Sequence, residues 1–242
     1  MYFFFSTDSF TAKHNLNTSF FYDSNESVFD GVKMIKINPE TEFQKLLTIS
    51  FQLLDEKFEV ISRKSYILKL DVKYTKKALR LIDSFDNLKD IETEYVNIDE
   101  IKDIIIDNLK KSNHFISYYN EHHLHLLLDS LDSDATDQIN VLFKDYPSKL
   151  TNIDVLQVSM PFTEKKMFPT GDRLRKPSLS EVYYWLNNNQ INISNSLDSV
   201  NTLIKCFKDL NNKGLISELY PNIEYVEELI KSTLKLYIDN KK

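Results

Sequence analysis

The chain has 242 residues and a formal net charge of −6, and 42% of its residues are hydrophobic. This length and composition predict a folded protein with a substantial core and are not typical of a disordered chain. Only Gly31, Gly171 and Gly214 occur as glycines, so there is no glycine-rich phosphate loop and no GxGxxG turn. We therefore expect no nucleotide cofactor.

The single cysteine, Cys206, excludes an intrachain disulfide framework and a thiolate zinc site. This cysteine usage favours a reducing, cytoplasmic location. No apolar run approaches the roughly 18 residues that a membrane span needs. We accordingly expect no membrane association.

Short strands are predicted at the start of the chain, and a helix follows them. The strands are Tyr2 to Phe5, Ser19 to Tyr22 and Val28 to Ile37. Asn38 suits an N-cap and Pro39 suits the first helical position, so a helix is expected to begin there. Its apolar stripe consists of Phe43, Leu46, Leu47, Leu53 and Leu54.

The middle of the chain predicts one hairpin, several helices and a last strand. Tyr66 to Tyr74 alternates apolar and polar residues, and Phe58 to Ile61 is expected to pair with it across Ser62 to Lys64. Helices are expected at Lys76 to Phe85, after Asn97, and from Ser133. Ile153 to Met160 is predicted to be a strand, which ends a mixed α+β body of residues 1–160.

Residues 161–177 hold three of the six prolines and are expected to form a connector between two domains. Five basic residues lie beside aromatic and apolar ones, a combination that suits contact with phosphates and bases. A solubilised linker explains the same residues. The basic residues are Lys165, Lys166, Arg173, Arg175 and Lys176.

Residues 178–242 are predicted to form a helical C-terminal module. Ser178 and Ser180 are candidate N-caps for a short helix, a second helix starts near Ser196, and Gly214 is the expected C-terminal cap. A short helix, a polar loop, a helix and then Lys-Gly-Leu-Ile resemble the recognition half of a winged-helix domain. This resemblance implies contacts to DNA from Asn195, Ser199, Asn201 and Lys205. Trp185 is expected in the core of the module.

Two features of the sequence suggest metal-dependent chemistry. In a strand, His123 and His125 would point the same way and would be candidate metal ligands. We favour the alternative that they are surface residues at the edge of a buried leucine segment. Asp154 lies in a predicted strand, and some metal-dependent nucleases resemble this arrangement. Those nucleases carry a lysine where Ser159 stands here, so Asp154 is also explained as a residue at the end of a strand. We predict no catalytic residue and no bound metal.

The whole sequence predicts an α+β fold with a winged-helix-like C-terminal module. The expected function is a non-enzymatic regulatory or accessory protein in nucleic-acid transactions, of the kind found in mobile elements. It is expected to bind a partner protein through the body, and DNA or a second protein through the C-terminal module. One alternative is an acidic inhibitor or decoy, because residues 82–145 hold 15 acidic and 5 basic residues. A second alternative is a metal-dependent nuclease or phosphoesterase.

Overall fold

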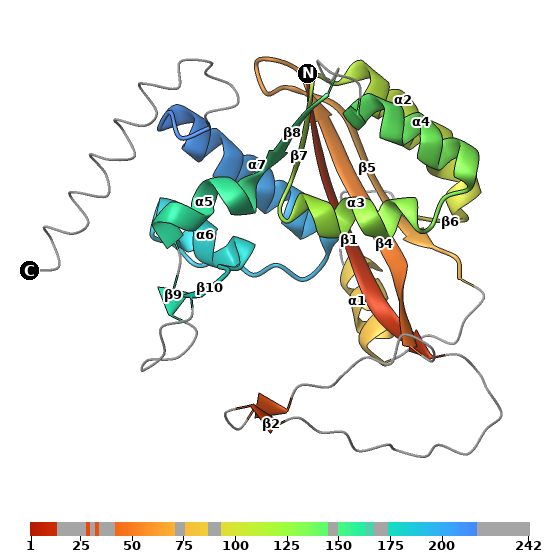
Figure 1. The fold of residues 1–242 in the computed structure, drawn as a ribbon, viewed down its shortest axis with the longest axis horizontal. Coiled ribbons are helices and arrows are strands. Elements are labelled where there is room, and N and C mark those ends of the chain that lie inside the picture. The colour runs from red at the N-terminus through yellow and green to blue at the C-terminus, as the bar shows by residue number, and fades with distance from the viewer. Residues whose placement is uncertain are drawn as a thin grey trace, which may run out of the picture.

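The structure is a computed structural model, and its architecture is one mixed β-sheet with helices on both faces (Figure 1). It describes residues 1–13, 28–29, 32–33, 42–70, 76–86, 93–144, 150–163, 165–166 and 174–216.

Six strands make the main sheet, in the order β6-β5-β4-β1-β7-β8. The strands β1, β4 and β5 form an antiparallel meander, and β6, β7 and β8 add parallel to their neighbours. The long strand β1 therefore lies in the middle of the sheet, between β4 and β7. The bounds are β1 Tyr2–Lys13, β4 Glu42–Leu54, β5 Val60–Leu68, β6 Thr93–Val96, β7 His114–Ser117 and β8 Thr151–Asp154.

Four further strands form two small ribbons. The strand β2 pairs with β3, and β9 pairs with β10, both antiparallel. Their bounds are β2 Val28–Phe29, β3 Val32–Lys33, β9 Lys165–Lys166 and β10 Leu174–Arg175.

The two faces of the sheet carry different helices. One face is covered by α2 (Ile98–Lys111), α3 (Asn120–Leu128) and α4 (Ser133–Lys144), which Figure 1 shows on the same side of β1. The other face is covered by α1, α5, α6 and α7. Their bounds are α1 Lys76–Asp86, α5 Val155–Thr163, α6 Leu179–Asn187 and α7 Ser196–Asn212.

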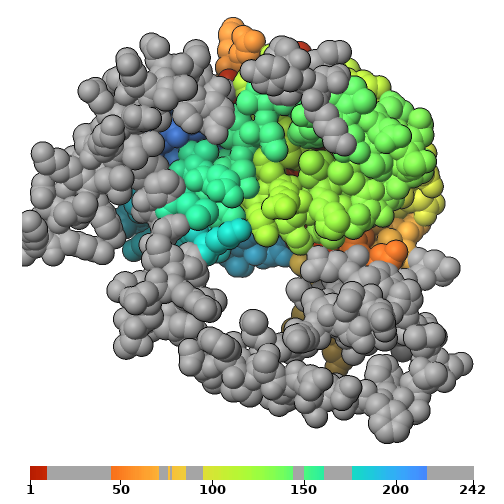
Figure 2. All heavy atoms as spheres, viewed as in Figure 1, coloured from red at the N-terminus to blue at the C-terminus, as the bar shows by residue number. Residues whose placement is uncertain are grey.

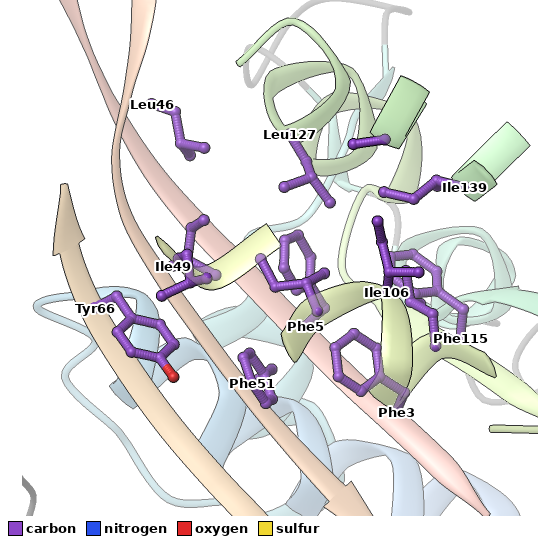
Figure 3. Close-up of a cluster of buried hydrophobic side chains, with 14 of the residues drawn as sticks. Phe3, Phe5, Leu46, Ile49, Phe51, Tyr66, Ile106, Phe115, Leu127 and Ile139 are labelled. Carbon is purple, nitrogen blue, oxygen red and sulfur yellow. The ribbon is translucent and has the colours of Figure 1, made fainter. Parts of the chain in front are cut away.

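Alternating residues of β1 contribute to the two separate cores. Phe3 and Phe5 pack with Phe51 and Phe115 under α2 to α4, the cluster shown in Figure 3. Phe4 points to the opposite face and meets Phe207 of α7 edge to face at 5.3 Å. Because strand side chains alternate between faces, the run of three phenylalanines supplies both cores at once.

Much of the predicted architecture is confirmed. The mixed α and β class is correct, and so are the helices α1, α2, α4, α6 and α7. The Ser178 hydroxyl and the Glu181 carboxylate form a reciprocal capping box at the start of α6. Gly214 has a φ of +67°, the left-handed conformation expected just after a helix.

Several predicted elements are wrong. The expected helix from Asn38 contains β4 instead, and β5 is one continuous strand, so its hairpin partner is β4 and Ser62 to Lys64 is no turn. The expected strand after Ile153 ends at Asp154, where α5 begins. Trp185 is 41% exposed and lies outside the core. The predicted strand Ser19 to Tyr22 lies outside the described residues, and so does the segment Pro221 to Lys242, whose apolar spacing predicts a last helix.

Residues 178–216 pack directly on the sheet of residues 1–160. Leu203 and Phe207 of α7 share a core cluster with Phe4 of β1 and Ile153 of β8. The predicted boundary at residues 161–177 itself stays a prediction. Among the described residues, no helix is long and apolar enough to span a membrane.

Candidate active site

Asp8 is a partly exposed carboxylate on the central strand. Its Oδ2 atom accepts hydrogen bonds from the Thr48 hydroxyl at 2.8 Å and from the Ser196 backbone N–H at 2.6 Å. The first contact reaches across to β4, and the second reaches to the first residue of α7. A β-bulge interrupts the β1–β4 register directly after Asp8. Bulges are common next to active sites because they redirect side chains.

A buried polar layer continues from Asp8 under the start of α7. The Ser196 hydroxyl lies 2.9 Å from the Thr48 hydroxyl and 2.8 Å from the Ser50 hydroxyl, and Ser50 is bonded in turn to Ser65. These four residues come from β4, β5 and α7. The layer holds the N-terminus of α7 against the sheet, where a helix N-terminus favours a carboxylate such as that of Asp8.

His123 of α3 lies on the other side of β1, beside Thr7. The Thr7 backbone N–H donates to His123 Nδ1 at 3.2 Å, and the Thr7 hydroxyl lies 2.8 Å from the same nitrogen. Burial, and after it the charge of His122, lower the pKa of His123 from 6.5 to about 4. The imidazole is therefore neutral near pH 7, and its Nδ1 accepts a hydrogen bond.

An aromatic group extends from His123 to the surface. The His122 and His123 rings meet edge to face at 5.6 Å, and His122 stacks on Tyr119 at 5.7 Å with 15° between the ring planes. Lys176 Nζ lies 4.5 Å from the centre of the Tyr119 ring. Figure 2 shows yellow-green atoms, the colour of α3, bordering cyan atoms, the colour of α6 and the residues that flank it.

Asp154 binds backbone N–H groups. Its Oδ1 atom accepts from Tyr119 N and Leu156 N, both at 2.9 Å, and its Oδ2 atom accepts from Asn120 N at 3.2 Å. These bonds join the end of β8 to the starts of α3 and α5. The prediction that Asp154 lies at the end of a strand is confirmed. Its three hydrogen bonds to backbone N–H groups give the carboxylate a structural role that requires no catalysis.

The predicted DNA contacts on α7 occupy different environments. Asn195 is buried, caps α7 through the Asp198 N–H and donates to Ser84 of α1. Asn201 Oδ1 accepts from Gln52 at 2.7 Å and from Arg63 at 3.3 Å. Ser199 is partly buried, and Lys205 is exposed, with its Nζ atom 5.8 Å from the Tyr183 ring. The described contacts thus direct Asn195 toward α1 and Asn201 toward the sheet.

The predicted basic connector is only partly described. Lys165 and Lys166 lie in β9 and Arg175 lies in β10, whereas Arg173 lies outside the described residues. Lys176 is exposed and is the one basic connector residue with a described side-chain contact. Their role in binding nucleic acid stays a prediction.

The predicted histidine pair is not brought together. His123 and His125 lie on a helix, where residues two apart face different directions, and His125 is mostly exposed beside Asp129. Within the described ranges, no three acidic, histidine or cysteine side chains form a group that fits a metal ion. Burial, followed by Asp209, raises the pKa of Cys206 to about 12, so Cys206 is no ready nucleophile.

Sequence reasoning missed Asp8, Thr48 and Ser196 as a group. Ser6-Thr7-Asp8 interrupts an apolar strand with three polar residues, which was the available signal. Thr48 and Ser196 come from segments far apart in the sequence, and only the packing of α7 on β4 joins them.

No protein-family model matches the chain, and no curated protein matches it. Solved structures are similar in fold. Escherichia coli Exonuclease I in complex with a 5cy-dT13 oligonucleotide has a TM-score of 0.50 and 12% identity, covering 91% of this chain and 42% of that chain. Exonuclease I in complex with the inhibitor BCBP has a TM-score of 0.49 and 13% identity, covering 91% and 43%.

A third similar structure is the Neurospora crassa Pan2 catalytic unit, described as its protease and nuclease domain. Its TM-score is 0.46 at 11% identity, and the match covers 90% of this chain and 29% of that chain. The chain therefore spans less than half the length of these proteins.

These findings correct two predictions. The winged-helix prediction is wrong, because the first turn of α7 is hydrogen-bonded to β1 and β4 and so cannot enter a DNA groove. The prediction of a non-enzymatic accessory protein is contradicted by the similarity in fold to the Exonuclease I structure with the 5cy-dT13 oligonucleotide, and it is withdrawn. The chain is similar in fold to part of Escherichia coli Exonuclease I.

Proposed function

We propose that this protein is a nuclease that cleaves phosphodiester bonds in a nucleic-acid strand, with Asp8 at the reacting phosphate. The observation that carries the proposal is Asp8 itself, a partly exposed carboxylate beside a bulge on the central strand of this fold. The similar Exonuclease I structure contains a DNA oligonucleotide, which supports a strand of nucleic acid as the substrate. A cytoplasmic location remains part of this proposal.

The donor set near Asp8 suits one kind of metal binding. A preformed zinc site requires three or four protein ligands, and the described residues offer no such group. Mg²⁺ differs, because it commonly binds one or two carboxylates and completes its shell with water and substrate phosphate oxygens. Asp8 fits this mode, in which the ion would supply a polarised phosphate and an activated water.

The neighbouring residues fix the site before a substrate arrives. Thr48 and the Ser196 N–H hold the Asp8 carboxylate in one orientation. His123, neutral near pH 7, accepts from Thr7 and thereby ties α3 to the strand that carries Asp8. Such hydrogen bonds around a reacting group preserve its geometry, and geometry determines much of an enzyme's rate.

The test is hydrolysis of end-labelled single-stranded DNA and RNA in the presence of Mg²⁺ or Mn²⁺, followed on denaturing gels. Asp8→Asn keeps the shape of the side chain and removes its charge. We expect this change to lower the rate by at least about tenfold, the lower end of what the loss of a partner at a metal site costs. Asp129→Asn is the control, because Asp129 is mostly exposed and its carboxylate pairs with His125 of α3.

Shortened products from the parent protein and from Asp129→Asn, but not from Asp8→Asn, would support the proposal. Intact DNA and RNA after incubation of the parent protein with either metal would overturn it. Equal rates for the parent and Asp8→Asn would overturn the assignment of Asp8.

A further inference from the structure

We propose that Tyr119, His122 and Lys176 form a subsite that stacks on an unpaired base of a nucleic-acid strand and binds its phosphate. This inference rests on the proposed function, because it gives the strand that is cleaved at Asp8 a second contact, on the α3 side of β1. The substrate class is single-stranded DNA or RNA, since only an unpaired base presents its flat face to an aromatic ring.

Tyr119 has an unusual backbone for a bulky residue. Its φ of 69° and ψ of 61° lie in the left-handed region, which glycine and asparagine tolerate better than tyrosine. The Asp154 carboxylate stabilises this turn by accepting hydrogen bonds from the N–H groups of Tyr119 and Asn120. The conformation of the turn therefore does not explain why a tyrosine occupies this position. Strained residues of this kind concentrate at functional sites.

The Tyr119 side chain has the exposure and the neighbours of a binding platform. It is 39% exposed, its ring stacks on His122, and Lys176 Nζ lies 4.5 Å from its centre. Burial, followed by the charge of His125, lowers the pKa of His122, so the His122 ring in this stack is uncharged near pH 7. Uncharged rings suit a base, and the lysine adds a cation for the phosphate.

Contacts link this platform to Asp8. The His122 ring touches the His123 ring, His123 binds Thr7, and Thr7 precedes Asp8 on β1. The Tyr118 hydroxyl also donates to the Pro177 carbonyl, which joins the residue before Tyr119 to the residue after Lys176. These contacts place the stacked rings on the α3 side of β1, whereas the Asp8 carboxylate meets α7 on the other side. A strand bound at both places therefore passes around β1.

The experiment measures fluorescence anisotropy of labelled oligo-dT and oligo-U with the full chain in EDTA, which separates binding from hydrolysis. Tyr119→Gly removes the ring and suits the left-handed backbone. We expect affinity to fall roughly 5- to 150-fold, the range for loss of one base stack, while the thermal midpoint stays the same or rises. Tyr119→Phe should keep the affinity within about twofold, because it keeps the ring.

Lys176→Gln should reduce the dependence of log affinity on log salt by about 0.7, the value for one phosphate contact to a single strand. Lys208→Gln is the matched control, since Lys208 also lies over an aromatic ring, that of Phe58 at 5.1 Å. The control should leave the salt dependence unchanged. The DNA and RNA probes decide which of the two strands the subsite prefers.

Three outcomes would overturn the subsite: unchanged affinity in Tyr119→Gly, a lowered midpoint together with lowered affinity in that variant, or equal losses in Tyr119→Phe and Tyr119→Gly. Weak binding by Tyr119→Gly with no hydrolysis by the parent would support the subsite and overturn the nuclease. Hydrolysis by the parent together with unchanged binding by Tyr119→Gly would support the nuclease and overturn the subsite. No binding by the parent would overturn both.

Discussion

His123 is a histidine that the fold keeps neutral. Burial, followed by the charge of His122, lowers its pKa to about 4, and the Tyr118 carbonyl offsets part of this effect. In the unfolded chain the pKa would be near 6.5. Between these values the unfolded chain binds a proton that the folded protein excludes, so acid favours unfolding.

We expect the free energy of unfolding to fall by about 2 kcal/mol from this group alone as the pH falls from about 7 to 5. His123→Asn keeps an acceptor for Thr7 and removes the titration, so its loss over the same interval should be smaller by about that amount. Urea unfolding at both pH values measures the difference. His125→Asn, on the exposed side of α3, is the control. Equal losses for the parent and His123→Asn would assign the acid sensitivity elsewhere.

For single residues, the sequence revealed which residue types matter but not the direction in which their side chains point. The cluster from His122 to His125 was recognised, yet its use as a metal pair required a strand, and α3 is a helix. Trp185 was assigned to the core from helical spacing, but the broad apolar stripe of α6 buries only Leu179 and Val182 fully. The spacing of apolar residues locates the buried face of a helix to within about one residue, and Trp185 lies at the edge of that face.

The helix α7 is the element that completes the Asp8 site. Its first residue, Ser196, is fully buried and bonds Thr48 and Ser50 through its hydroxyl and Asp8 through its backbone N–H. A buried hydroxyl with two partners is costly to remove, because its partners lose a hydrogen bond without gaining water. Ser196 therefore fixes the position of α7 as well as the orientation of Asp8.

We expect Ser196→Ala to lower the free energy of unfolding by about 1 to 3 kcal/mol, the cost of unsatisfied buried hydroxyls. Ser199→Ala, one turn further along α7, removes a partly buried hydroxyl and should change stability by less than about 0.5 kcal/mol. Chemical denaturation compares the two variants. A neutral Ser196→Ala would mean that the polar layer does not hold α7.

The strand β4 shows why one element was predicted wrongly. It lies between β1 and β5 with both faces covered, so its apolar residues do not alternate, and a continuous apolar run fits either a buried strand or a helix. The Asn-Pro start favoured a helix. The strand pairing that decides the matter comes from β1 and β5, which local sequence does not reveal.

For the whole molecule, β1 joins the two cores. Phe5 packs under α2 to α4 and Phe4 packs against α7, although the two residues are neighbours in sequence. The mixed α and β class was predictable from local patterns. The placement of α7 on the sheet was not, because a winged helix and this fold share the same local helix pattern and differ in what the helix packs against.

We expect one cooperative unfolding transition rather than two. Trp185, the one tryptophan, reports on α6, and far-UV circular dichroism reports on the whole chain. Phe4→Ala should cost about 3 to 5 kcal/mol and shift both signals together, since it leaves a cavity between β1 and α7. Tryptophan fluorescence that changes well before the circular dichroism would instead support the predicted separate domain from residue 178.

The pairing of β1 also shapes how the chain folds. Phe4 pairs with Gln52 on one side and with Ile116 on the other, so the central strand forms its contacts only after long loops close. The hairpin of β4 and β5, closed by a short turn, has no such delay. During synthesis the Phe3-Phe4-Phe5 segment therefore lacks its neighbour β7 until more than a hundred further residues have been added. An apolar segment with β propensity is prone to aggregation in that interval, so we expect the yield of soluble protein to depend on slow translation or on chaperones.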